Sequence, residues 1–153
     1  MPQKDKACGF ISGKKEIQKW SKTDLFQFFY DTKPLLGELK NIIKPPDIDS
    51  IKTSIKISSE NLYHAAIHSF IHSDNLRQNL PNLYKMIFFI LQAKYFVETN
   101  NYIPTKNQLT ELLINEDREI LEICIKRENI VKKDLNEIEK LYYKLIQWSS
   151  NNI

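Results

Sequence analysis

The chain has 153 residues, of which 42% are hydrophobic and 27% charged, with a formal net charge of +3. This length and hydrophobic content exclude an intrinsically disordered chain and suffice for a core without disulfides or structural metals. The small net charge, made of alternating signs, disfavours nucleic acid as a partner, because nucleic-acid-binding domains usually present a concentrated basic face.

The cysteines and the apolar runs bear on the compartment. Cys8 and Cys124 are isolated, and neither belongs to a metal-binding pair, which favours a reducing environment. The longest uninterrupted apolar run, residues 86–91, is far shorter than the roughly 20 residues that cross a bilayer. No apolar segment follows the first residues as it does in a secretory signal peptide. We therefore expect a cytoplasmic protein with no membrane partner.

The predicted elements are all helices. Residues 1–22 are expected as a loose lead-in and residues 23–153 as one helical domain. Thr23 is a candidate N-cap for a first helix over residues 24–32. Its predicted apolar face comprises Leu25, Phe28 and Phe29.

A long helix is expected after the rigid break at Pro45–Pro46, because each proline fixes φ and removes a hydrogen-bond donor. Asp49 or Ser50 is the predicted cap, and the helix is expected to run to about Ser73. Its predicted stripe comprises Ile51, Ile55, Leu62, Ala65 and Ala66.

The next predicted helix is the centre of the fold. Residues 74–80 are expected as a polar loop, with Pro81 in the first helical turn, where its missing N–H costs nothing. Residues 86–91 are apolar on every side, which predicts a helix surrounded by partners as far as about Glu98. Thr99 and the two asparagines after it are expected to end this helix.

Three more helices are predicted towards the C-terminus. Thr105 and Gln108 have the capping-box spacing, Asn115 is a candidate cap for residues 116–127, and Asp134 begins the last helix. The last predicted stripe comprises Leu135, Ile138, Leu141, Tyr142, Leu145 and Trp148. No segment alternates like a strand, so the sequence predicts an all-α bundle of four to six helices with a buried central helix.

All three histidines lie on the long helix. Glu60, His64, His68 and His72 follow one another at intervals of four residues, which places them near one face. Three interpretations stay open: a metal site using His64 and His68 with a ligand from another helix, a ligand-facing or pH-sensitive polar face, and a half-buried interface with satisfied histidines.

The sequence lacks the usual parts of a phosphate-binding or nuclease site. Its three glycines all lie at or before Gly37, so no glycine-rich phosphate loop is present. Asp47 and Asp49 imitate a magnesium-binding aspartate pair, but a turn that caps the following helix explains them better. No histidine follows Arg77 at the spacing of small helical RNase toxins. We therefore expect no enzymatic activity from this chain alone and no cofactor.

Several short motifs carry a family resemblance. Leu35–Glu38 forms a turn before Pro45–Pro46, Asn82–Leu83 opens a helix that ends in Val97–Asn100, and Ile103–Lys106 starts the next helix. In this order, from Leu35 to Leu113, the chain resembles the C-terminal helical domain of aminoglycoside nucleotidyltransferases, the streptomycin/spectinomycin adenylyltransferase type. Asn100 stands where that family has glycine, which is compatible because asparagine tolerates a left-handed backbone.

The resemblance implies a helical substrate-binding or cleft-completing domain that acts with a catalytic nucleotidyltransferase domain, since the Gly-Ser loop and catalytic aspartates of that family are missing here. The residues matched loosely to its substrate-facing wall are Glu60, His64, His68 and Glu98. Two other functions stay open. One is a HEPN-like interaction subunit of toxin–antitoxin type that forms a homodimer, and the other is a metal-binding helical bundle that uses His64 and His68.

Overall fold

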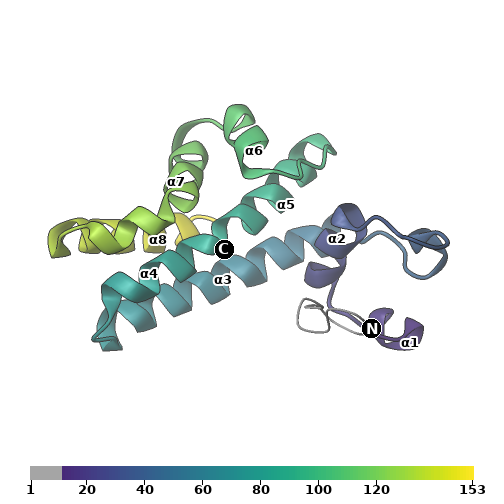
Figure 1. Ribbon diagram of the computed structural model, residues 1–153, viewed down its shortest axis with the longest axis horizontal. Coiled ribbons are helices and arrows are strands. Elements are labelled where there is room, and N and C mark those ends of the chain that lie inside the picture. The colour runs from purple at the N-terminus through teal and green to yellow at the C-terminus, as the bar shows by residue number, and fades with distance from the viewer. Residues whose placement is uncertain (1–11) are drawn as a thin grey trace, which may run out of the picture. The chain divides into compact units, whose positions relative to one another are not determined.

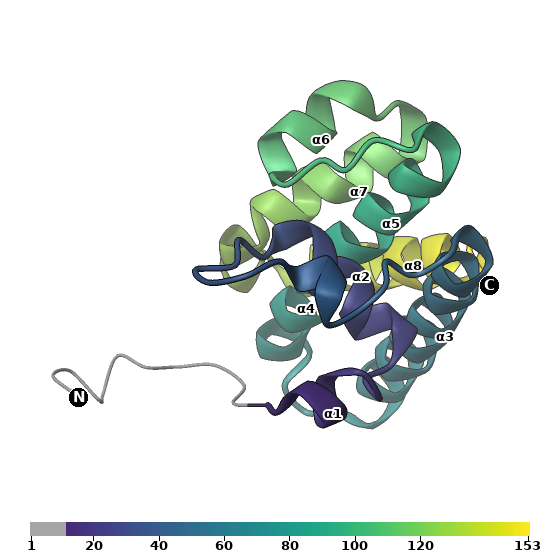
Figure 2. The same cartoon turned by 90° about the vertical axis from the view of Figure 1, so that its right-hand side faces the viewer.

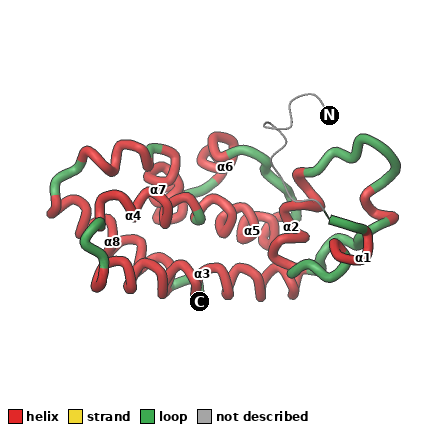
Figure 3. Tube along the Cα trace, turned by 60° about the horizontal axis from the view of Figure 1, so that its bottom comes forward, coloured by secondary structure: helices red, strands yellow, loops and turns green. Residues whose placement is uncertain are grey.

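The computed structural model describes residues 12–153, apart from the side chain of Thr23. Within this range the chain is helical and has no strand (Figure 3). The prediction of an all-α bundle is confirmed. No helix among the described residues is long and apolar enough to cross a membrane. Cys8 and half of the expected lead-in lie outside the described range.

The chain divides into two compact units between Pro46 and Asp47. The boundary expected after residue 22 falls inside the first unit. Among the described residues of the first unit, the helices are α1 (Lys14–Ile17), α2 (Lys22–Asp31) and the 3-10 helix η2 (Leu39–Asn41). Ser21, and not Thr23, is the N-cap of α2, and its side chain accepts from the Asp24 N–H at 3.2 Å.

In its described part, the first unit buries fewer apolar side chains than the sequence offers there. Leu25 and Phe26 are buried on α2, whereas Phe28 and Phe29 are only half-buried, so the predicted face of this helix was partly wrong. The turn after α2 needs a glycine, because Gly37 has a φ of +72°. The two leucines before it, at positions 35 and 36, are 102% and 96% exposed.

The second unit consists of six α-helices and one 3-10 helix. They are α3 (Ile48–His72), α4 (Leu76–Lys85), α5 (Ile87–Thr99), α6 (Lys106–Leu112), α7 (Asn115–Ile125), η3 (Arg127–Lys132) and α8 (Leu135–Ser150). The long α3 packs against α4, α5 and α8, and it runs antiparallel to the α4–α5 pair (Figure 1). Helix α5 also contacts α7, and α7 in turn contacts α6 (Figure 2).

The loop predicted over residues 74–80 is wrong, because α4 begins at Leu76 and encloses Pro81. Tertiary packing outweighs the polar local sequence, since Leu80 and Tyr84 are completely buried. Proline has no N–H to donate to the fourth carbonyl before it, a loss that this burial offsets. The expected single helix is also interrupted at Met86, whose N–H bonds to Leu83 in a tighter turn.

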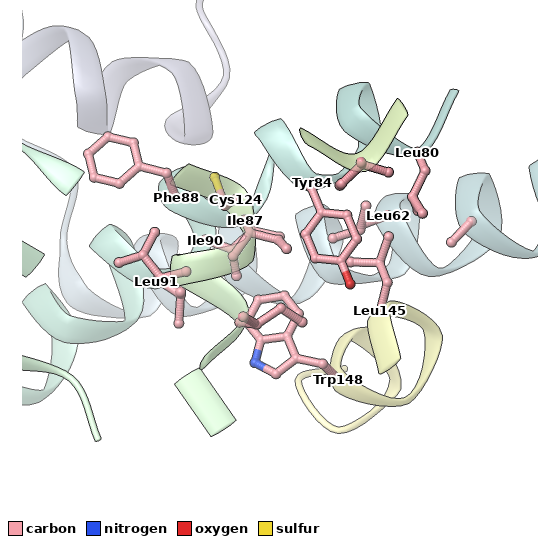
Figure 4. Packing of buried hydrophobic residues seen from close by; sticks show 14 of the residues in the cluster. Leu62, Leu80, Tyr84, Ile87, Phe88, Ile90, Leu91, Cys124, Leu145 and Trp148 are labelled. Atoms are coloured by element: carbon pink, nitrogen blue, oxygen red, sulfur yellow. The ribbon is translucent and has the colours of Figure 1, made fainter. Parts of the chain in front are cut away.

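The core lies between α3, α4, α5, α7 and α8, whose apolar side chains converge as Figure 4 shows. Ile87, Phe88, Ile90 and Leu91 are buried, which confirms a buried central helix. Met86 and Phe89 are 37% and 41% exposed, however, so the helix is not enclosed on every side. Met86 and Phe89 are three residues apart and therefore share one narrow face, which stays partly in solvent even though it is apolar.

The helix ends agree with the sequence at some positions and not at others. Asp134 forms the full capping box of α8 with Glu137, and Thr105 caps α6. Asp47 caps α3 in place of Asp49 or Ser50, because its side chain accepts from the Ser50 N–H at 2.8 Å. The expected cap Asn115 is instead the first residue of α7, with a φ of +50°.

Candidate functional site

An open pocket of about 700 Å³ lies on the first unit, along one side of α2. Its walls comprise Trp20, Ser21, Asp24, Gln27, Phe28 and Asp31. Four of these residues occupy positions i, i+3, i+4 and i+7 of α2, which share one helix face. We call this feature the α2 pocket.

Local contacts shape the aromatic end of the α2 pocket. Trp20 precedes the N-cap and meets Phe28 edge to face, with ring centroids 5.4 Å apart and planes at 66°. The Ser21 hydroxyl donates to one carboxylate oxygen of Asp24 at 2.7 Å. Asp24 therefore has a structural role at the first turn of α2, where the helix dipole favours negative charge.

Asp31 has no such local role. It is the last residue of α2, where the partial negative charge of the helix end disfavours a carboxylate, and no basic residue occupies that turn. Within residues 12–153 neither Asp31 nor Asp24 takes part in an ion pair. The α2 pocket thus combines two carboxylates with aromatic walls, a combination that attracts an organic cation.

The structure places the predicted site residues on the second unit. His64 and His68 are exposed on α3, and Glu60, which is half-buried, pairs with Lys56 at 3.9 Å. Glu98 is exposed near the end of α5. Within residues 12–153, no ion pair joins Glu98 to the three residues on α3, and the four do not form a group that could hold a metal ion.

The predicted metal pair, His64 and His68, is not the pair of histidines whose rings are in contact. His64 contacts Tyr63, with ring centroids 5.5 Å apart, and the ring contact on this face joins His68 to His72. In the described part of the chain, no group of three or more His, Cys, Asp and Glu side chains could hold a metal ion.

A polar network joins three helices of the second unit. Asp117 on α7 accepts from the Lys94 ammonium at 2.7 Å and from the Trp148 indole N–H at 2.8 Å. Lys94 also donates to the Asn152 side chain at 3.1 Å. Every polar group in this network has a partner inside the unit, so the network explains helix packing and needs no ligand.

Cys124 is completely buried in the core and carries a free thiol. Burial raises the pKa of this thiol, although the positive charges of Lys106 and Arg127 act in the opposite direction. A buried neutral thiol is a poor nucleophile, so Cys124 belongs to the core and not to a site.

The residues of the α2 pocket were missed at the sequence level. The sequence pattern predicts Phe28 on the apolar face of the first helix and predicts no role for the carboxylates of α2. Their spacing held a usable signal, because Asp24 and Asp31 are seven residues apart and therefore lie on one helix face. The contribution of Trp20 had no such signal, since it depends on the chain folding back onto α2.

No protein-family model, curated protein or solved structure matches the chain. The resemblance to the adenylyltransferase helical domain and the HEPN-like alternative therefore both stay predictions.

Proposed function

We propose that the chain is a non-catalytic, substrate-binding helical domain of nucleotidyltransferase type that works with a separate catalytic domain. The observation that carries this proposal is the α2 pocket. Aminoglycosides carry several positive charges on a sugar framework, and two carboxylates beside aromatic walls complement such a ligand. The family resemblance of the sequence motifs supports the same substrate class.

Asp31 is the residue that best separates a binding role from a structural one. A carboxylate is unfavourable at the C-terminal end of α2, so helix stability does not explain why Asp31 occurs there. Proteins commonly keep such locally unfavourable groups where function needs them. In this proposal, Asp31 pairs with an ammonium or guanidinium group of the substrate while Trp20 and Phe28 contact its carbon framework.

Two exposed leucines support a partner domain. Leu35 and Leu36 lie side by side in the turn after α2, and both side chains are almost entirely in solvent. Burying one leucine side chain is worth roughly 1.5–3 kcal/mol, so a partner surface that covers both would gain substantially. In this proposal, the catalytic domain contacts this turn.

The experiment is calorimetric titration of the full chain with streptomycin at low ionic strength. We expect Asp31→Asn to weaken binding about three- to tenfold, because one charge-assisted contact is lost. Glu38→Gln is the control, since it removes the same charge from an exposed position outside the α2 pocket, where Glu38 pairs with the nearby Lys40 at 3.1 Å. Equal weakening by both variants would indicate a general charge effect and refute the pocket assignment.

Unfolding of the variants provides a second readout. Asp31→Asn should leave the melting temperature unchanged or raise it slightly, because it removes a carboxylate from the negative end of α2. A clear loss of stability would mean that Asp31 has a structural role, and its effect on binding would then not support the proposal.

A further inference from the structure

The exposed face of α3 brings two histidine rings into contact. His64, His68 and His72 are all exposed and are spaced evenly along the helix. The rings of His68 and His72 have centroids 5.0 Å apart and planes at 52°. His64, by contrast, contacts the ring of Tyr63. Side-chain placement, and not sequence spacing, therefore distinguishes the two histidine pairs.

The distance between the ring centroids of His68 and His72 fits two imidazoles bound to one metal ion. A zinc–nitrogen bond is about 2.0–2.1 Å long, and each ring centre lies about 1.1 Å behind its nitrogen, so it is about 3.2 Å from the metal. Two ring centres are then about 4.5 Å apart for a right angle at the metal and about 5.2 Å apart for a tetrahedral angle. The observed separation of 5.0 Å lies between these limits.

The position in the helix favours a cation as well. His72 is the last residue of α3, and the partial negative charge of a helix C-terminus attracts positive charge. No third His, Cys, Asp or Glu joins the pair among residues 12–153. Two protein ligands leave the other coordination positions to water, as in sites that stay open to an exogenous ligand.

We propose that His68 and His72 form a bidentate site for a divalent transition cation. Imidazole nitrogen suits Ni²⁺, Cu²⁺ and Zn²⁺, with Cu²⁺ bound most tightly, whereas Mg²⁺ and Ca²⁺ prefer oxygen ligands. The site lies on the second unit, outside the α2 pocket, and does not depend on the proposed function.

The test is a calorimetric titration of the full chain with Ni²⁺ alone, without a histidine tag and with Cys8→Ser to remove a competing thiol. We expect one ion per chain and no binding of Mg²⁺. His68→Asn and His72→Asn should each weaken Ni²⁺ binding at least tenfold, while His64→Asn should stay within twofold of the parent chain.

Three outcomes overturn the proposal. The first is no Ni²⁺ binding by the parent chain. The second is unchanged binding in His72→Asn, which would move the site to another pair. The third is an equal loss in all three variants, which would indicate a diffuse histidine surface. All three side chains are exposed on one helix, so the His64 variant controls for any effect on folding.

Discussion

At the scale of single residues, Tyr84 links packing to a measurable pH dependence. Its side chain is completely buried, and its hydroxyl donates to the backbone carbonyl of Leu141 on α8 at 2.9 Å. Burial raises the pKa of Tyr84 far above its ordinary value of 10.0. The unfolded chain therefore loses this proton first as the pH rises.

The contribution of Tyr84 to stability is fully present below pH 10 and is lost as the pH rises from there towards the folded-state pKa. Tyr84→Phe should cost about 0.5–1.5 kcal/mol at neutral pH, because the bond to Leu141 is removed. It should also flatten the alkaline decline, which urea unfolding at a series of pH values measures. An unchanged decline in the variant would show that Tyr84 does not titrate in this way.

At the scale of elements, the end of α5 is a sharp test of backbone conformation. Asn100 is its C-cap, with a φ of +57° in the left-handed region, and its N–H bonds to the Phe96 carbonyl at 2.7 Å. Glycine enters this region without strain, whereas a side chain without a local hydrogen-bonding group costs roughly 1–2 kcal/mol there.

We expect Asn100→Gly to keep or slightly raise the melting temperature and Asn100→Ala to lower it. Thermal unfolding followed by far-ultraviolet circular dichroism measures both. Which variant has the higher melting temperature matters more than either melting temperature by itself, because both variants remove the same amide group. If alanine proved as stable as glycine, the left-handed cap would be wrong.

The helix ends also show how far sequence reasoning reaches. Asp134 and Asn100 were predictable, since a capping box and a left-handed cap depend on side-chain chemistry within a few residues. The start of α4 was not, because the buried Leu80 and Tyr84 hold a proline-containing segment in a helix through contacts distant in sequence. The α2 pocket was missed for a similar reason, since Trp20 reaches it only in the folded chain.

At the scale of the whole molecule, the division after Pro46 predicts an independent second unit. The main hydrophobic cluster, from Leu62 to Trp148, lies entirely within residues 47–153. That fragment has 107 residues, counted from 47 to 153 inclusive, which is enough for a self-sufficient core.

We expect the fragment 47–153 to be helical and to unfold in one cooperative transition, because each part of its core is contained in it. Near-ultraviolet circular dichroism should report an ordered environment for the buried Trp148. A helical fragment without that signal or a sharp transition would show that the second unit needs residues 1–46 to fix its packing.

The proposed function makes its most direct claim about what this chain binds in the absence of a catalytic domain. The decisive measurement is a pair of calorimetric titrations of the full chain, one with streptomycin and one with ATP and Mg²⁺. A substrate-binding domain without a phosphate loop should bind streptomycin through the α2 pocket and should not bind the nucleotide. The Asp31→Asn variant should bind streptomycin measurably more weakly than the parent chain. Binding of ATP, or no binding of streptomycin, would contradict the account.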